Sequence, residues 1–264
     1  MNVLIYGLPK SGTTFAFASV CEALPNNARN FERPTFVTQD DLNRGLTAKM
    51  VYDKAGNLDY MNGIASRCDK IIQIIRDPRD RLVSSILYAP YNLVTGPNKQ
   101  SILGLPGLIR KKEEDPDSVS CAELVAALGG KDYYIPTMGK ELDLIAGDEW
   151  GAKRGKPVLT VSYEGLMDGI AFDSISDFLG VKVKPTVKTS GALSRVSRSK
   201  RTGDWKNWLT INDVRDFNPI ACTNIAHFRY LPNWMLPARQ VIEPQFGSEF
   251  AQAQIDRRLK QEQK

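Results

Sequence analysis

A glycine-rich segment near the start of the chain, GLPKSGTT at residues 7–14, has the composition of a phosphate-binding loop. It lies between the apolar run Val3–Tyr6 and a helical pattern over Thr13–Leu24, where a strand would turn into a helix. Backbone N–H groups at the start of a helix converge on an anion, and the hydroxyls of Thr13 and Thr14 add donors there. The segment therefore predicts a site for a phosphate or a phosphate-like group.

The position of the lysine in this loop is unusual. In the common loop of ATP and GTP hydrolases a lysine directly follows the second glycine. Here Thr13 holds that position, and the lysine of the loop is Lys10. This pattern favours a relative that handles a different phosphoryl-like group. The alternative is a nucleotide or small-molecule kinase with a variant loop, against which the missing lysine counts.

A second cationic position follows the apolar run Lys70–Ile75, which reads as a buried strand. Arg76 would project from the carboxyl end of that strand, where ligands of parallel sheets lie. An Asp-Pro pair then opens a helical pattern over Pro78–Tyr88, and Ser84 falls two turns into it. An arginine fork and a hydroxyl can jointly hold a phosphate monoester.

A third cationic segment, RSKRTGDWKN at residues 198–207, is a basic loop that ends in a Gly-Asp-Trp turn. A further short segment, VSYEGL at residues 161–166, follows the last strand candidate and contains a tyrosine. Together with the two anchors above, these segments give the chain several positive or polar positions in a fixed order.

The four segments together resemble the sulfotransferases that use 3′-phosphoadenosine-5′-phosphosulfate (PAPS) as the sulfo donor. The resemblance covers residues 2–15, 70–88, 157–166 and 198–210. It implies that adenosine 3′,5′-bisphosphate is the product. It also implies an acceptor with a hydroxyl or amine on a small molecule, a lipid or a carbohydrate.

The resemblance also implies a role for individual residues. The positions that match the family's 5′-phosphosulfate loop are Lys10, Ser11, Gly12, Thr13, Thr14 and Phe15, and the family usually has tryptophan at the last of them. Lys10 matches the catalytic lysine that contacts the sulfo group and the bridging oxygen. Arg76 and Ser84 match the two ligands of the 3′-phosphate. Tyr163 matches a tyrosine that reaches the nucleotide.

The basic loop departs from the family pattern in part. Arg198 falls on the family arginine that binds the 3′-phosphate, five residues before Gly203. Ser199 stands where the family has lysine, and Lys200 stands where it has glycine. Lys200 and Arg201 are therefore candidate substitutes for the missing lysine.

The general base is the least specific part of the pattern. Cytosolic steroid and phenol sulfotransferases use a histidine before the Arg76 segment, but the sole histidine here, His227, lies far after it. Carbohydrate and tyrosine sulfotransferases use a glutamate about one strand after the phosphate loop, and Glu32, 22 residues after Lys10, matches that position. Asp53 is the second candidate. The absent histidine also leaves open a non-catalytic nucleotide-binding module.

The elements that must position these residues alternate along the chain. The strand candidates are Val3–Tyr6, Lys49–Tyr52, Lys70–Ile75, Pro157–Val161 and, more weakly, Thr35–Val37. The helical patterns are Thr13–Leu24, Pro78–Tyr88, Ser120–Leu128 and Ile170–Leu179. Such alternation predicts an α/β fold with three layers, α/β/α, around a central, mainly parallel sheet. The loop at its first strand makes the fold similar to P-loop nucleotide-binding proteins.

The chain has 264 residues, which suits a single domain over residues 1–264. Within it, residues 91–117 read as an irregular surface insertion or lid, and residues 186–204 as a loop. Residues 248–264 read as a charged tail, either a helix or a frayed end.

Bulk composition excludes several classes of protein. A net charge of +5 and 42% hydrophobic residues describe an ordinary globular protein without the basic footprint of a nucleic-acid binder. The four cysteines form no CxxC pair, so neither a metal site nor a disulfide framework is expected. No apolar run is long enough for a membrane span, and we expect a cytoplasmic protein.

Overall fold

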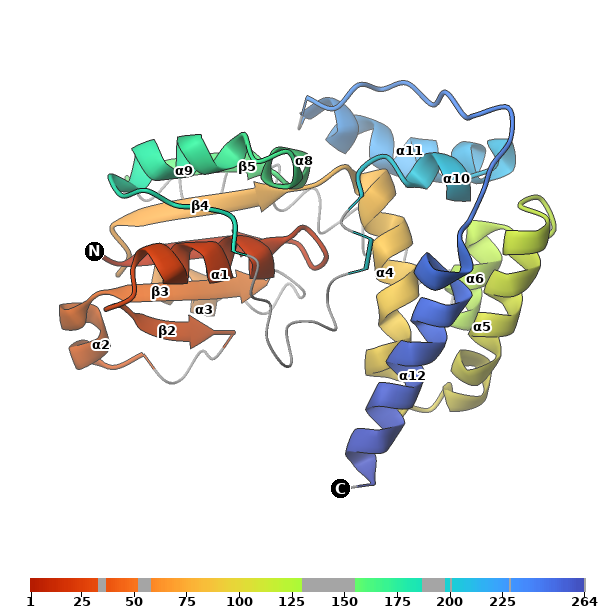
Figure 1. Ribbon diagram of the computed structural model, residues 1–264, viewed down its shortest axis with the longest axis horizontal. Coiled ribbons are helices and arrows are strands. Elements are labelled where there is room, and N and C mark those ends of the chain that lie inside the picture. Colours follow the sequence, from red (N-terminus) through yellow and green to blue (C-terminus); the bar gives the residue numbers. More distant parts are fainter. Residues whose placement is uncertain are drawn as a thin grey trace. The chain divides into compact units, whose positions relative to one another are not determined.

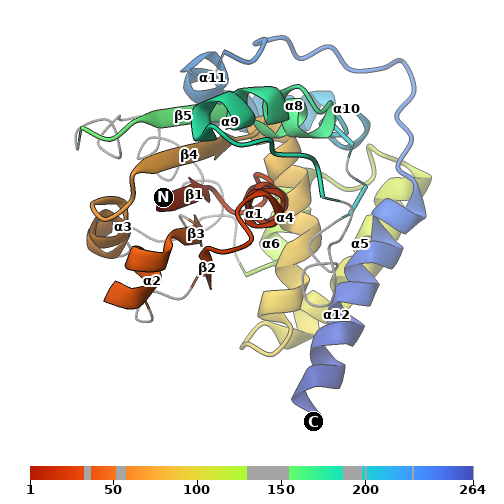
Figure 2. The same cartoon turned by 60° about the vertical axis from the view of Figure 1, so that its left-hand side comes forward.

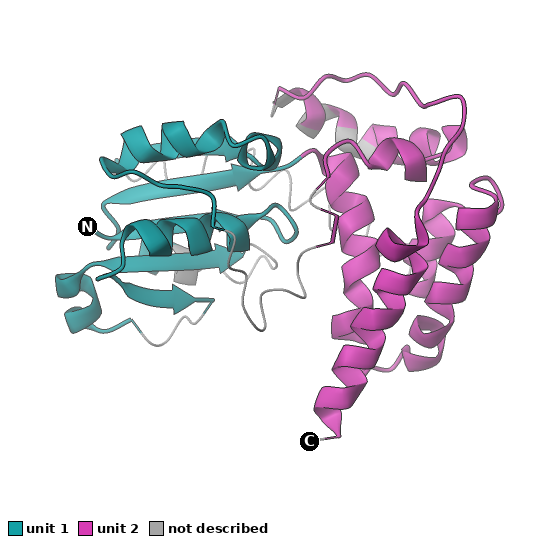
Figure 3. Ribbon diagram, viewed as in Figure 1, with its two compact units in different colours: residues 1–76, 141–194 teal, residues 77–140, 195–264 magenta. Residues whose placement is uncertain are grey.

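The computed structural model describes residues 1–32, 37–51, 58–129, 155–186, 198–199, 201–227 and 229–263, which Figure 1 and Figure 2 show from two directions. The chain divides into two compact units (Figure 3). Unit 1 comprises Met1–Arg76 and Glu141–Ser194, and unit 2 comprises Asp77–Lys140 and Arg195–Lys264. Each unit is described separately below.

Unit 1 is built on a parallel sheet whose described strands lie in the order β2-β3-β1-β4-β5 (Figure 1). The strands are β1 (Val3–Gly7), β2 (Ala28–Phe31), β3 (Leu46–Val51), β4 (Lys70–Ile75) and β5 (Val158–Ser162). All four strand pairs are parallel. The order means that the chain returns to the other side of β1 after β3, a switch point beside which ligands bind in such sheets.

Helices cover both faces of this sheet. They are α1 (Thr13–Ala23), α2 (Gln39–Arg44), α3 (Leu58–Ala65), α8 (Tyr163–Met167) and α9 (Ala171–Leu179). Val3 and Ile5 of β1 share a buried cluster with Phe17 of α1 and Phe172 of α9. The residue between them, Leu4, faces the opposite side and is also fully buried. In Figure 1 and Figure 2, α3 lies on the other side of the sheet from α1. The predicted α/β fold is therefore confirmed.

Unit 2 is helical in the residues that the structure describes. Its elements are α4 (Pro78–Leu93), α5 (Lys99–Glu114), α6 (Cys121–Ala127), α10 (Trp205–Trp208), α11 (Ile211–His227), the 3₁₀ turn η5 (Pro244–Phe246) and α12 (Ser248–Glu262). α12 packs against α4 and α5. Ile86, Ile109, Trp208 and Ile255 belong to the buried cluster that holds these helices together.

One expectation about secondary structure was wrong, and another falls largely outside the described residues. The weak strand candidate Thr35–Val37 lies outside the described part except for Val37, which is not in a strand; the edge strand that the structure describes is β2, Ala28–Phe31. The segment 91–117 is not irregular, because Lys99–Glu114 forms α5. Its apolar residues repeat at helical spacing and are fully buried at Ile102, Leu105 and Ile109.

The other predicted elements are confirmed with small shifts of their ends. β3 begins at Leu46 rather than at Lys49, and α4 continues to Leu93. Residues 248–262 form a regular helix, α12, which settles the choice between a helix and a frayed end. No helix in the described residues is long and apolar enough to span a membrane.

Candidate functional site

The glycine-rich loop connects the end of β1 at Gly7 to the start of α1 at Thr13, as the sequence predicts. A side chain at Gly7 would overlap the carbonyl oxygen of Ile74 on β4, so only glycine fits there. The loop backbone is left-handed at Lys10, with φ of 68°, and at Gly12, with φ of 88°. Gly12 caps α1 without a side-chain hydrogen bond, and the first turn of α1 holds no acidic residue. The start of α1 thus presents N–H groups in a setting that suits an anion.

The residues just inside α1 differ in how far they reach solvent. Thr13 is buried, with 4% of its surface exposed, and Thr14 is partly exposed. The Phe15 ring packs edge-on against Phe172 of α9, with 5.6 Å between ring centroids. Phe15 therefore fixes α1 against α9 in addition to any contact with a ligand.

Arg76 ties the loop to two other strands of unit 1. Its Nη1 donates a hydrogen bond of 2.9 Å to the carbonyl oxygen of Lys10. Its guanidinium lies 4.1 Å from the centroid of the Tyr163 ring, in a cation–π contact. A Cβ atom at Gly12 would lie only 2.6 Å from Cδ2 of that same ring. Three of the segments singled out from the sequence therefore meet at the carboxyl ends of β1, β4 and β5.

Two polar atoms in this cluster are buried without a hydrogen-bond partner among the described residues. They are Oγ of Ser11 and Nε of Arg76. Ser11 is 1% exposed and Arg76 is 8% exposed. Leaving such groups unpaired costs free energy, and native structures rarely do so without a reason. A donor pair of this kind beside a helix N-terminus fits the phosphate groups of a nucleotide.

Glu32 lies directly after β2 in a left-handed backbone conformation, with φ of 55°. Its carboxylate forms an ion pair with Nζ of Lys49 on β3. Lys49 is 3% exposed and its Nζ lies 4.2 Å from the centroid of the Phe31 ring. Since β2 is two strands from β1, the ends of these strands are about 10 Å apart at the same edge of the sheet. Asp53, the second candidate for the base, lies outside the described residues.

Lys49 is a residue that the sequence did not single out. A buried lysine is rare unless it is paired. The signal in the sequence was a single lysine within the apolar run LTAKMV of residues 46–51. Its partner follows from strand register, because Phe31 is aligned with Lys49 and Glu32 comes next.

Ser84, Arg198 and Arg201 belong to unit 2. Ser84 is 7% exposed and lies in the interior of α4. Arg198 forms an ion pair of 2.6 Å with Asp204, and its Nη1 donates a hydrogen bond of 3.0 Å to the carbonyl oxygen of Phe246. The structure does not describe Lys200.

Arg201 forms an ion pair with Glu243. The hydrogen bond between them raises the pKa of the Arg201 guanidinium and lowers the pKa of the Glu243 carboxyl. Arg198 and Arg201 are thus already engaged by carboxylates of unit 2.

Three of the four cysteines are buried, which bears on their reactivity. Burial raises the pKa of Cys21 to about 11 and that of Cys68 to about 12, and it raises the pKa of Cys121 further. These thiols stay protonated near neutral pH, so they are poor nucleophiles. Among the described residues, no group of three or more His, Cys, Asp or Glu side chains is placed to hold a metal ion.

Comparison with known families supports the assignment suggested by this geometry. The sulfotransferase domain family matches residues 1–199, three quarters of the chain, including the loop, Arg76 and Tyr163. No curated protein matches the chain significantly. Members of this family use PAPS as the sulfo donor. Membership sets aside both the kinase and the non-catalytic module. The chain therefore belongs to the sulfotransferase domain family and is a PAPS-dependent sulfotransferase.

Proposed function

We propose that this enzyme transfers a sulfo group from PAPS to a hydroxyl or amine of a small-molecule, lipid or carbohydrate acceptor by in-line displacement. The observation that carries the proposal is the cluster of Lys10, Gly12, Arg76 and Tyr163. There a phosphate-type loop is hydrogen-bonded directly to a second cationic anchor. A donor with two separate phosphate positions needs such paired anchors, whereas plain ATP does not.

PAPS supplies the sulfo group on a phosphosulfate anhydride, and the protein's part is to position it and neutralise charge. We assign the 5′-phosphosulfate to residues 10–15, where Ser11 supplies a buried hydroxyl and α1 supplies its N-terminal N–H groups. Lys10 is the catalytic cation, because its side chain brings positive charge to the end of β1, where negative charge develops on the leaving oxygen. Its left-handed backbone fixes the direction in which that side chain leaves the loop.

We assign the 3′-phosphate to Arg76 of unit 1. In unit 2, the resemblance to the family predicts Ser84 and Arg198 as its ligands, with Arg201 and Lys200 as further cations of the basic loop. Nε of Arg76 is buried and has no partner among the described residues, which leaves a donor for the ligand. The Tyr163 ring holds the guanidinium plane in place through stacking. The phosphate would exchange with the carboxylate of Glu243 that now engages Arg201, whereas Asp204 stays paired with Arg198.

Glu32 is the residue that we propose as general base. The Glu32 side chain is 41% exposed, so an acceptor can reach its carboxylate from solvent. Lys49 holds the carboxylate in place through the ion pair between them. The pair also sits at the carboxyl edge of the sheet, as the loop does.

Nucleotide binding tests the donor assignment. We expect adenosine 3′,5′-bisphosphate to raise the melting temperature at lower concentration than ATP with magnesium does. An Arg76→Ala variant should lose affinity for the bisphosphate by more than about tenfold and lose less for AMP, which lacks the 3′-phosphate. Arg44→Ala, at an exposed arginine of α2, is the matched control and should bind both nucleotides like the wild type. Equal losses for the two nucleotides would contradict the role of Arg76.

Transfer of radiolabelled sulfo groups from PAPS to a panel of phenols, lipids and sugars tests the reaction. We expect Lys10→Ala to lower turnover by at least about a hundredfold, because it removes the charge that stabilises the leaving oxygen. Full activity of Lys10→Ala with any acceptor that the wild type uses would refute the catalytic assignment.

A further inference from the structure

The carboxylate of Asp80 holds the turn that follows the basic loop. Asp80 lies in the first turn of α4 and is 1% exposed. It accepts a hydrogen bond of 2.6 Å from the backbone N–H of Gly203 and one of 2.9 Å from the backbone N–H of Trp205. These two residues flank Asp204, so the one carboxylate fixes the backbone on both sides of it. Bonds to an ionised acceptor are shorter and stronger than neutral ones, which makes this a rigid attachment.

Arg79, the residue before Asp80 in α4, contacts a side chain of the same turn. The Arg79 guanidinium lies 4.1 Å from the centroid of the Trp205 ring. It is kept in that orientation by Asp77, whose carboxylate accepts from both Nε and Nη2 of Arg79. The start of α4 therefore binds the backbone of the turn through Asp80 and its aromatic side chain through Arg79.

The Gly203–Trp205 turn sets the position of Arg198 through Asp204. Asp204 pairs with the Arg198 guanidinium at 2.6 Å, and the carbonyl oxygen of Phe246 holds its other end. Both side chains of the ion pair are at least 90% buried. A shift of the Asp204 backbone would therefore move the guanidinium as well, because neither side chain has room to compensate.

We propose, on the basis of the function proposed above, that Asp80 is a positioning residue for the nucleotide. It touches no phosphate itself. It fixes the Gly203–Trp205 turn, and through Asp204 it presents Arg198 to the 3′-phosphate in a single orientation. Such preorganisation lowers the entropy lost on binding and is expected to affect donor affinity rather than the chemical step.

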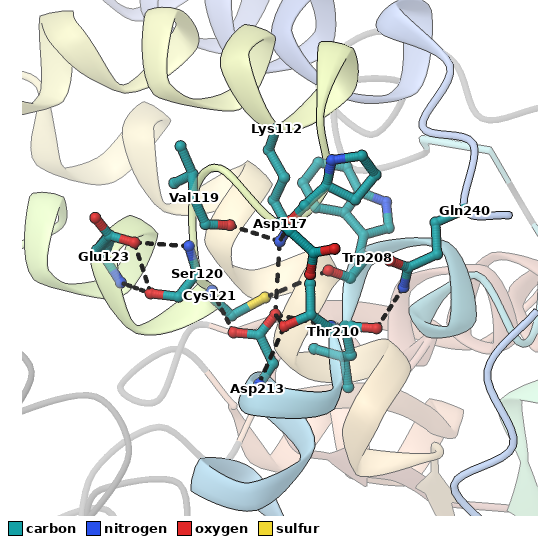
Figure 4. Close-up of polar contacts among 12 residues, drawn as sticks. Lys112, Asp117, Val119, Ser120, Cys121, Glu123, Trp208, Thr210, Asp213 and Gln240 are labelled. Carbon is teal, nitrogen blue, oxygen red and sulfur yellow. Dashed lines mark hydrogen bonds and ion pairs between the residues drawn. The ribbon is translucent and has the colours of Figure 1, made fainter. Parts of the chain in front are cut away.

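The matched control is another buried aspartate of unit 2. Asp213 is 2% exposed and accepts hydrogen bonds from the backbone N–H groups of Cys121 (2.6 Å) and Thr210 (2.9 Å). Figure 4 shows this carboxylate among Lys112, Cys121 and Thr210. Asp80 and Asp213 thus both accept hydrogen bonds from the backbone of two residues. The backbone bound by Asp80 flanks Asp204, the ion-pair partner of Arg198, whereas the backbone bound by Asp213 does not.

The test compares Asp80→Asn with Asp213→Asn in calorimetric titrations with adenosine 3′,5′-bisphosphate and with AMP. We expect Asp80→Asn to weaken bisphosphate binding about tenfold, since one charge-assisted acceptor is lost. Its affinity for AMP should change by less than about twofold, because AMP has no 3′-phosphate to place. Asp213→Asn should lower the melting temperature but leave the preference for the bisphosphate over AMP intact. In turnover assays, Asp80→Asn should raise the KM for PAPS with little change in kcat.

The outcomes separate this inference from the function on which it rests. A wild type without preference for the bisphosphate over AMP would overturn the proposed donor site, and the role of Asp80 with it. A wild-type preference that Asp80→Asn retains in full would overturn the role of Asp80 alone. Equal loss of preference in both aspartate variants would reduce Asp80 to a general contributor to stability.

A second pair of variants covers the case in which Asp80→Asn does not fold. Gly203 has φ of 74° and open space around its Cβ position, so Gly203→Ala strains the same turn without a clash. Gly180, at the end of α9 in unit 1, has the same φ of 74° and the same open space. We expect Gly203→Ala to reduce the preference for the bisphosphate and Gly180→Ala to keep it. The opposite ranking would contradict the inference.

Discussion

At the scale of single residues, the candidate site depends on how closely Gly12 approaches an aromatic ring. The Tyr163 ring fills the space that a side chain at position 12 would need, and the same ring stacks on Arg76. Arg76 in turn bonds to the carbonyl oxygen of Lys10. These contacts link the four residues to one another, so we expect a substitution at one of them to displace its neighbours.

Gly12→Ala should therefore both destabilise the protein and weaken nucleotide binding. The backbone at φ of 88° costs about 1–2 kcal/mol for any L-residue, and overlap with the ring adds about 1–3 kcal/mol. Urea unfolding and titration with adenosine 3′,5′-bisphosphate measure the two effects. Gly169→Ala is the control, since Gly169 has φ of 84° and an empty Cβ position. Equal destabilisation by the two variants would show that the ring relaxes freely.

The local part of this site was predictable and the long-range part was not. The loop could be read because glycines, a lysine and threonines stand close together in the sequence between a strand and a helix. The stacking of Arg76 on Tyr163 joins residues far apart in the chain, and it depends on the pairing of β4 with β5. The contact between Glu32 and Lys49 depends in the same way on the register of β2 and β3.

At the scale of elements, a buried lysine joins α5 to the start of α11. Nζ of Lys112 donates to the carbonyl oxygens of Pro116 (2.8 Å) and Val119 (2.6 Å) and pairs with Asp213 at 3.5 Å. Lys112 has no exposed surface. A buried charge of this kind is tolerated only because its partners are complete, so its removal leaves the aspartate without a cation.

Lys112→Met should lower the free energy of unfolding by about 3–5 kcal/mol, although it adds an apolar side chain to an apolar core. Chemical denaturation monitored by tryptophan fluorescence gives this number. Lys111→Met is the control on the same helix, because Lys111 is exposed, and it should change stability by less than about 0.5 kcal/mol. A Lys112→Met variant as stable as the control would mean that water or a rearranged loop replaces the lysine.

The elements missed from the sequence share a physical cause. In α5 the helical repeat of Ile102, Leu105 and Ile109 is regular, but Pro106 and two neighbouring glycines interrupt it with residues typical of loops. Packing against α6 and α12 stabilises the helix despite its weak local preference. β2, with the sequence ARNF, lacks the apolar run of a central strand because it lies at the edge of the sheet.

At the scale of the whole molecule, the chain folds as two compact units of which the second includes its last residues. The last helix, α12, contributes Ala251 and Ile255 to the buried cluster of unit 2. Its start is held by Glu113, which accepts from the backbone N–H and the hydroxyl of Ser248. These contacts make the final segment part of the core of unit 2.

Deletion of residues 248–264 should lower the melting temperature by about 10 °C or more, because it exposes the apolar faces of α4 and α5. Differential scanning calorimetry measures the change. A shorter deletion of residues 263–264, which follow the end of α12, should leave the melting temperature within about 1 °C of the wild type. A full deletion without thermal effect would mean that α12 is dispensable for unit 2.

The carboxylate of Glu243, which now engages Arg201, acts as an internal countercharge. In the donor site proposed above, a singly charged ligand that replaced this carboxylate would exchange one monoanion for another and gain little electrostatic energy. A phosphate monoester carries close to two charges at neutral pH, so its arrival would leave a surplus of attraction. The exchange would therefore favour a terminal phosphate over carboxylates and sulfate monoesters, which carry one charge each.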